Sequence, residues 1–333
     1  MNQISAELLS AMYVAFNTAF KSGLQRGRGA PITTQSMMQY LVKFSELGMN
    51  VPSTTATEIH AWLCQIPGFV EWIGDRVAKR LTEHGLKVDN KDYVNTVTVG
   101  RNKVLDNQYG MYATVIEQMG AEGADDAFWL DLLIESLVST ALWADGEAFF
   151  SATRKFGDVT CNNIIDSTLS QANLKAACNR MLGFKGDQNI SLNVVPYMVL
   201  CGKTAFWTAK KFCEDETVSD DAGESVSNET RGIATPRWHY GLNDDAWYML
   251  GVKGSIRPLC AQRRQEATAL QTLVNPNDPN VFWQKEFVYG TDLRGNGFRP
   301  FPFLIVRGSA GTPPGGAAPV AAPVAGGKAK SKE

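Results

Sequence analysis

A stretch of alternating apolar and polar residues constrains the fold more than any other feature of the chain. It reads LKVDNKDYVNTVTVGRNKVL over residues 86–105. Leu86 and Val88, and later Val97 and Val99, alternate with polar residues, and the DNKD sequence between the two pairs has turn composition, so the stretch predicts a two-stranded ribbon. Both faces of this ribbon are polar, and an isolated hairpin is only marginally stable in water. We therefore expect it to be stabilised from outside, with a neighbouring subunit as the natural candidate.

Helical periodicity predicts much of the remaining first half. Apolar residues recur at helical spacing from Leu8 to Phe20, behind Ser5, which suits an N-cap. We expect helices over residues 5–23, 35–47, 54–65, 67–85 and 125–143. Gly85 is expected to cap the fourth of these helices. The fifth is expected to be the longest in the protein and to end at Gly146.

The second half is expected to alternate short helices with strands. Helical patterns cover residues 171–182 and 203–212, and a strand is expected between them at 191–200. Further strands are expected at 236–242, 246–252, 256–260, 282–292 and 298–306, with a turn at Gly295-Asn296-Gly297. The acidic stretch 214–229 predicts an exposed loop, and the Pro/Ala/Gly-rich tail from residue 309 predicts disorder.

One tripeptide has the appearance of a nucleotide site. Gly202-Lys203-Thr204 follows an apolar strand and precedes a helical pattern, as in a phosphate-binding loop. The first glycine of that motif would fall at position 197, which is a tyrosine preceded by Pro196. Without that glycine the backbone cannot curl its N–H groups around a phosphate. We therefore interpret the tripeptide as a turn between a strand and a helix.

Other signatures of chemistry are weak. The three histidines, His60, His84 and His239, belong to no metal motif, and the six cysteines are scattered without a C-x-x-C pair, which is typical of buried reduced thiols. Asp145 and Glu147 could form an acid/base pair, although carboxylates beside a glycine turn are more often solvated. We predict no catalytic residue, no cofactor and no metal, and the sequence does not support an enzyme.

Net charge and hydropathy indicate which classes of partner the chain can have. A net charge of -2 argues against a dedicated nucleic-acid reader, and no apolar run approaches the length of a membrane helix, so we expect no membrane partner. Lys21, Arg26 and Arg28 form a small basic patch that could face DNA, and the tail ends in further lysines. A DNA-associated binding protein therefore stays open as the alternative function.

The C-terminal third resembles the major head subunit of Mu-like phages and prophages, the gpT family. The resemblance rests on IRPL at residues 256–259, on Gln262, and on YGTD at 289–292 followed by Arg294. Upstream, TVTVGRNKVLDNQYGMY and WADGEAFFS are similar to family segments in the same order. Two departures stand out: the family usually has a histidine soon after the Phe-Phe pair, and the acidic stretch looks like an insertion.

The resemblance implies an α+β fold, the tailed-phage major capsid fold of the Hong Kong ninety-seven type. It assigns an N-terminal arm to residues 1–30, a peripheral domain to 31–157, an axial domain to 158–279, return strands of the peripheral domain to 280–308, and a disordered tail to 309–333. Within the peripheral domain it implies an extended hairpin loop at 84–107 and a spine helix at about 125–143.

The resemblance also implies a function without turnover. The chain is expected to form pentamers and hexamers that close into an icosahedral shell around phage DNA. The further partners it implies are a portal, scaffold or decoration proteins and non-specifically held DNA, with assembly in the host bacterial cytoplasm and a final location in the virion capsid. The expected inter-subunit contact residues are Lys87, Asp89, Lys91, Tyr93, Val97, Val99 and Arg101. Deleting Asp89–Asn102 is expected to leave a soluble fold and to block shell assembly.

Overall fold

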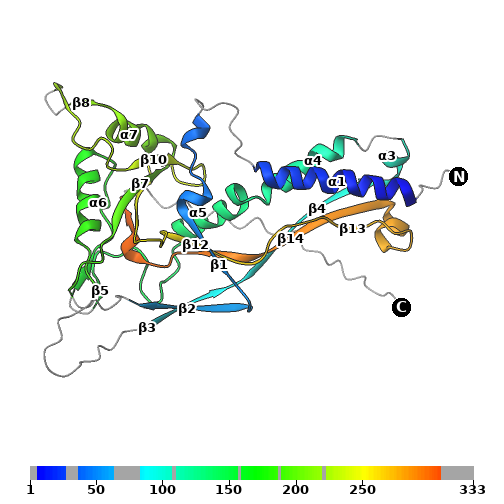
Figure 1. Ribbon diagram of the computed structural model, residues 1–333, viewed down its shortest axis with the longest axis horizontal. Coiled ribbons are helices and arrows are strands. Elements are labelled where there is room, and N and C mark those ends of the chain that lie inside the picture. Colours follow the sequence, from blue (N-terminus) through cyan, green and yellow to red (C-terminus); the bar gives the residue numbers. More distant parts are fainter. Residues whose placement is uncertain are drawn as a thin grey trace, which may run out of the picture.

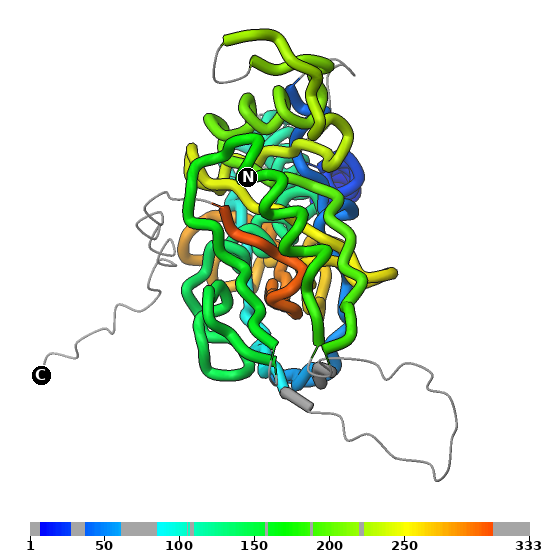
Figure 2. The backbone as a smooth tube through the Cα atoms, turned by 90° about the vertical axis from the view of Figure 1, so that its left-hand side faces the viewer, coloured from blue at the N-terminus to red at the C-terminus, as the bar shows by residue number. Residues whose placement is uncertain are grey.

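The structure is elongated, with a compact block at one end and a long sheet extending from it (Figure 1). This computed structural model describes residues 6–27, 37–63, 83–106, 110–156, 159–186, 189–219 and 223–308. Seen end-on, the block lies in front of the rest of the molecule (Figure 2). The fold is a mixed α+β architecture, as the sequence predicted.

The long sheet is built around β14 (Glu286–Phe298). One edge of β14 pairs antiparallel with β4 (Lys91–Gly100) along nearly its whole length. The other edge pairs in succession with β13 (Gln271–Leu273) and β12 (Leu259–Gln265), both antiparallel. Beyond β12, β1 (Gly48–Pro52) adds in parallel. Burial alternates along most of β14, so one face of the sheet must be covered.

That face is covered by α1 (Ala6–Arg26), which confirms the first predicted helix. Met12, Phe16 and Phe20 recur every four residues and are buried, and the Phe16 ring meets the buried Tyr289 ring of β14 edge-on at 5.0 Å. The helix α4 (Gly110–Glu122) packs beside α1, after the short α3 (Arg101–Leu105).

The predicted spine helix is shorter and less regular than expected. A π-helical turn, η2 (Asp125–Trp129), leads into α5 (Leu130–Val138), which ends before Trp143. Arg299 donates to the carbonyl oxygens of Leu137, Ser139 and Ala141, so a side chain from the residue that follows β14 caps the helix. The prediction that this is the longest helix is wrong, since α1 has 21 residues.

The compact block holds a four-stranded sheet in the order β10 (Thr235–Trp238), β7 (Val195–Cys201), β11 (Trp247–Val252) and β15 (Ile305–Arg307). Two helices flank it, α6 (Gln171–Gly183), capped by the Ser170 hydroxyl, and α7 (Lys203–Glu214). The elements predicted at 171–182, 191–200 and 203–212 are therefore confirmed. The expected division at 280 is wrong in detail, because β15 joins the block while β12 and β13 lie in the long sheet.

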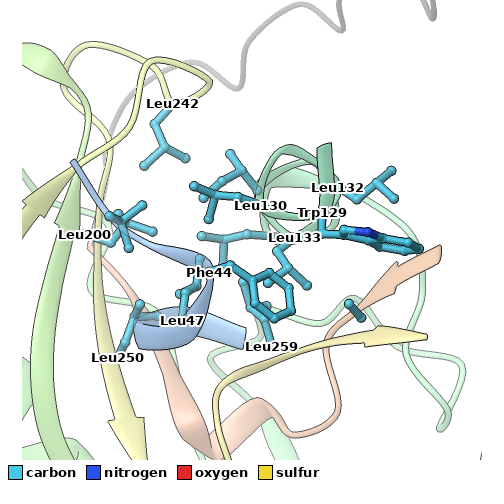
Figure 3. Close-up of a cluster of buried hydrophobic side chains, with 14 of the residues drawn as sticks. Phe44, Leu47, Trp129, Leu130, Leu132, Leu133, Leu200, Leu242, Leu250 and Leu259 are labelled. Carbon is cyan, nitrogen blue, oxygen red and sulfur yellow. The ribbon is translucent and has the colours of Figure 1, made fainter. Parts of the chain in front are cut away.

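A single core joins the block to the long sheet. Leu200 and Leu250 from the block meet Leu259 of β12, Leu133 of α5 and Phe44 of the short helix α2 (Phe44–Leu47) (Figure 3). Because the same buried cluster crosses between the two sheets, the two parts of the described chain share one hydrophobic core.

Short elements complete the described chain. They are the 3₁₀ turns η1 (Met37–Tyr40) and η4 (Pro302–Leu304), the π-helical turn η3 (Asn280–Gln284), and the hairpins β5–β6 (Arg154–Phe156, Val159–Cys161), β8–β9 (Thr217–Ser219, Ser225–Ser227) and β2–β3 (Thr57–Leu63, Glu83–Asp89). The acidic stretch expected to be a loop contains the exposed β8–β9 hairpin.

Several predicted elements are wrong. The helix expected at 54–65 is strand β2, and the helix expected at 35–47 is reduced to η1 and α2. Gly85 lies inside strand β3 instead of capping a helix. Most of the helix expected at 67–85 falls outside the described residues, as does the tail from residue 309.

The turn expected at Gly295-Asn296-Gly297 is part of β14. A Cβ on Gly295 would lie 2.8 Å from the Trp129 ring, and one on Gly297 would lie 2.5 Å from the Leu132 oxygen. These glycines therefore serve the close approach of η2 and α5 to an extended strand rather than a turn.

Candidate assembly surfaces

The structure replaces the predicted ribbon with a different hairpin. Strand β3 pairs antiparallel with β2, from Thr57 opposite Asp89 to Leu63 opposite Glu83, whereas β4 pairs with β14. We call the β2–β3 hairpin the finger; it lies outside the long sheet, below it in Figure 1. The expected pairing of residues 86–88 with 97–99 is thus wrong, although both segments are strands.

The reason is the apolar face of β4. Val99 is fully buried, Val97 packs against the same core, and the Tyr93 ring meets Phe128 edge-on at 4.8 Å. Burial, with a smaller contribution from Glu135, raises the pKa of Tyr93 to about 12. Val99 is therefore internal, which corrects its expected burial on a neighbour. Tyr93 and Val97 are half-buried against the same core, and their contact with a neighbour stays a prediction.

The same burial overturns the proposed deletion. Removing Asp89–Asn102 would remove β4, the strand that pairs with most of β14. We therefore expect that deletion to unfold the long sheet instead of leaving a soluble fold.

The charged candidates are placed differently. Lys87, Asp89, Lys91 and Arg101 are exposed. Lys87 and Asp89 belong to the finger, where their charged atoms lie 3.7 Å apart, whereas Lys91 is the first residue of β4 and Arg101 follows its last. The structure therefore does not bring the seven predicted contact residues together on one surface.

Among the side chains of the finger that the structure describes, Ile59 is a large apolar one that faces solvent. Ile59, in the middle of β2, is 72% exposed, opposite Lys87. The turn that leads into β2 is fixed by Glu58, whose Oε1 accepts from the Thr54 and Thr55 amides and from the Ser53 hydroxyl. The Thr55 and Thr54 amides lower the pKa of Glu58 to about 2. The finger thus leaves the body from a hydrogen-bonded turn.

A second exposed apolar surface lies at the far end of β14, in η3. Phe282 and Trp283 are 66% and 79% exposed, and their rings form an edge-on pair at 4.9 Å. The loop is held by Asn280, whose amide donates to the Leu273 and Glu286 carbonyls, and by the buried Val281. Two exposed aromatic rings on a fixed loop are typical of a protein–protein contact.

The Gly202-Lys203-Thr204 turn joins β7 to α7, as predicted. The amides of Thr204 and Ala205 both donate to the Asp244 carbonyl at 3.0 Å, and the Lys203 ammonium lies 3.2 Å from the Asp244 carboxylate. The backbone N–H groups of the first helical turn, which a phosphate would need as hydrogen-bond donors, are therefore already bonded within the protein. Gly202 is required because a Cβ there would collide with the Asn243 carbonyl.

The basic patch predicted near the N-terminus is only partly described. Lys21 is exposed on α1, Arg28 lies outside the described residues, and Arg26 is paired with Glu117 at 2.5 Å. The pairing compensates the Arg26 charge, so the described part of this segment offers one free cation, Lys21.

The acid/base pair considered for Asp145 and Glu147 is structural. Asp145 accepts the Glu147 amide at 3.0 Å and lies 3.2 Å from the Nε of Arg154, a buried cation that donates to the Ala148 carbonyl. The Arg154 guanidinium also lies over the Trp143 ring, 4.8 Å from its centre. Sequence reasoning missed Arg154 and the helix-capping Arg299, because neither belongs to a local pattern.

Within the described part of the chain, no cluster of His, Cys, Asp and Glu could hold a metal. The five cysteines described there are free and buried, and burial raises the pKa of Cys178 to about 11 and of Cys260 to about 12. These thiols are protonated at neutral pH and poorly nucleophilic.

Among the described helices, none is both long enough and apolar enough to cross a membrane.

Comparison with known proteins links this geometry to viral shells. The fold is similar to a chain in the procapsid of bacteriophage JBD30, with a TM-score of 0.52 and 21% identity over 92% of this chain and 76% of that chain. A relative described as the Mu-like prophage FluMu major head subunit of Haemophilus influenzae is 26% identical over 297 residues, which are 89% of this chain and 71% of the relative.

A second relative and a family profile point to the same class of protein. The major capsid protein of Escherichia phage Mu is 29% identical over 110 residues, which are 32% of this chain and 35% of the Mu protein. The sequence profile described as "Mu-like prophage major head subunit gpT" matches residues 9–167, 164–237 and 224–309.

Proposed function

Since the chain belongs to the gpT family of Mu-like major head subunits, we propose that its copies form pentamers and hexamers that close into an icosahedral shell around phage DNA. The chain is a shell-forming major capsid protein with the tailed-phage capsid fold, as the resemblance implied. The proposal concerns how the copies hold together.

The observation that carries the proposal is the finger. It is a two-stranded hairpin outside both larger sheets, and it exposes Ile59 on β2 beside the charged pair of Lys87 and Asp89. A lone hairpin is marginally stable in water and gains stability when it pairs or packs elsewhere. We propose that the finger docks on the adjacent copy, as a heterologous contact in which one surface meets a different surface of the next subunit.

Shortening the finger tests this role. Residues 62–84 are removed, and Ala61 is joined to Gly85, its cross-strand partner, through Asn-Gly, which favours a two-residue hairpin turn. In the same variant Ile59→Thr removes the exposed apolar side chain of the remaining strand. The base of the finger and both larger sheets are kept. We expect a folded subunit with an unchanged circular dichroism spectrum and no closed shells in negative-stain images.

The matched control shortens the acidic hairpin in the same way, joining Val218 to its partner Val226. We expect this variant to form shells. Closed, normal-sized shells from the finger variant would refute the docking role, while failure of both variants to fold would be visible in the spectrum before imaging.

The other contacts follow from the same proposal. We propose that DNA is held without sequence reading, since the chain has a net charge of -2, and that a portal and scaffold or decoration proteins complete the particle. Assembly is proposed to take place in the host bacterial cytoplasm. No catalytic step is assigned to this chain.

A further inference from the structure

Gln262 is a fully buried polar side chain in the middle of the long sheet. It lies on β12, opposite Val51 of β1 on one side and Asn296 of β14 on the other. A buried amide is costly unless its donors and acceptor are all paired. Its partners therefore show what the residue does.

All of these partners belong to the base of the finger. The Gln262 Nε2 donates to Asn90 Oδ1 at 2.8 Å and to the Val88 carbonyl at 3.3 Å. Its Oε1 lies 2.8 Å from His60 Nε2, which must carry the proton because an amide oxygen only accepts. Asn90 in turn donates to Ser53 Oγ at 2.8 Å. One side chain of the sheet thus holds β2, β3 and the residue where the chain leaves the finger.

Apolar support for the finger is small by comparison. Val88 packs with Cys260 and Phe298 in a small buried cluster, and the His60 ring stacks on Phe298 at 4.6 Å. Leu86 is partly buried against both this cluster and the main core. Between β3 and α5 lies a hollow of about 350 Å³, lined by Leu86, Lys87 and Glu135 among others. The finger is therefore not packed against α5, and its direction depends on contacts at its base.

We propose that Gln262 is the positioning residue that fixes the direction of the finger relative to the long sheet. The network formed by Gln262, His60, Asn90 and Ser53 is directional, because hydrogen bonds weaken steeply away from their preferred angles. Without this network the hairpin would keep the small apolar cluster, the packing of Leu86 and the 2.9 Å hydrogen bond from Asn296 Nδ2 to the Asp89 carbonyl. We expect these contacts alone to let it shift over the hollow. This inference rests on the proposed docking of the finger, since a head-to-tail contact closes a ring only at one angle.

Distances within single subunits test the proposal before assembly. Spin labels are placed at Lys87→Cys on the finger and Lys203→Cys on the block, both more than half exposed, in a background with Cys64→Ser. The unsubstituted Gln262 protein should give one narrow distance distribution. Gln262→Met keeps the length of the side chain and removes its hydrogen bonds, and we expect it to replace the narrow peak by a broad or split one.

Gln265→Met is the matched control, because it makes the same change on the same strand at a residue that bonds Asp292 and not the finger. It should leave the narrow peak in place. If Gln262→Met does not fold, His60→Phe replaces it, since a phenyl ring keeps the stacking on Phe298 and loses the bond to Gln262. A narrow, unshifted peak in whichever of the two variants folds overturns the proposal.

Shell formation by the same variants separates the two proposals. A broadened distance distribution together with misassembled or open particles supports both. A broadened distribution with normal closed shells keeps Gln262 as the positioning residue and contradicts the need for finger docking.

Discussion

Gly23 of α1 and Gly120 of α4 lie where the two helices cross with their backbones in contact. A Cβ on Gly23 would collide with the Glu117 carbonyl and lie 2.8 Å from the Ala121 amide, and a Cβ on Gly120 would collide with the Phe20 carbonyl. The Arg26–Glu117 ion pair lies beside the same crossing. Neither helix could carry a larger residue here without moving away from its partner.

We therefore expect Gly23→Ala and Gly120→Ala each to lower the unfolding free energy by roughly 1–3 kcal/mol, since an added methyl group in a filled contact forces the backbone to shift. Denaturant unfolding of the unassembled subunit measures this. Gly110→Ala is the control, because nothing lies within 4 Å of a Cβ at the start of α4. A loss as large at Gly110 as at the crossing would contradict the explanation.

Arg263 of β12 is held between two aromatic rings. Its guanidinium lies 4.7 Å from the centre of the Phe44 ring and 4.6 Å from that of Trp129, and it bonds Asp125 at 2.7 Å. An ammonium cannot stack in this way, so Arg263→Lys should destabilise the subunit by about 1–3 kcal/mol. Arg264→Lys, at an exposed neighbour, should change little. Equal unfolding curves for the two variants would count against the stacked geometry.

Acid should loosen the turn at the start of the finger. Hydrogen bonds from the Thr55 and Thr54 amides lower the pKa of Glu58 from 4.5 to about 2. A lowered folded-state pKa means that the stabilisation is fully present above 4.5 and is lost as the pH falls towards 2.

Glu58→Gln mimics the protonated side chain, so the difference in unfolding free energy between it and the parent should shrink from about pH 6 to about pH 3. Denaturant titrations at the two pH values provide the measurement. A difference that stays constant would mean that the carboxylate does not hold the turn, and Glu216→Gln serves as an exposed control.

The Phe282–Trp283 pair should matter to assembly and not to folding. Trp283 is 79% exposed, so Trp283→Ser should change the unfolding free energy by no more than about 0.5 kcal/mol. Loss of the exposed ring should nevertheless weaken shell formation, measured by light scattering against protein concentration. Val226→Ser, at a partly exposed valine of the acidic hairpin, is the control. Unchanged assembly of the Trp283 variant would show that this end of β14 makes no strong contact.

The Gly202-Lys203-Thr204 turn should not bind nucleotide. The Thr204 and Ala205 amides are already bonded to the Asp244 carbonyl, and the Lys203 charge is paired with the carboxylate of the same residue. Calorimetric titration with ATP and magnesium should give no heat beyond dilution. Binding that disappears in Lys203→Ala would reverse this conclusion.

The sequence by itself determined the elements whose information is local. The apolar spacing of α1, the helical periodicity of α6, and the apolar run of β7 before Gly202 each specify a structure within one short segment, and each is confirmed. Family membership was also readable, because it depends on the order of short motifs along the chain. The predicted inter-subunit and DNA-facing residues remain predictions, except Val99, which is buried in the core.

Only the tertiary structure decided which strands pair. Residues 86–88 and 97–99 both have the alternation of a strand. In the structure β3 pairs with β2, where Leu86 lies opposite His60, 26 residues earlier, and β4 pairs with β14, far along the chain. No local pattern identifies either partner. Period-two patterns fix which side chains share a face but not the identity of the partner strand, which depends on where the apolar face can be buried. For the same reason Gly295 and Gly297 suggested a turn, although Trp129 and Leu132, distant in sequence, require them in an extended strand.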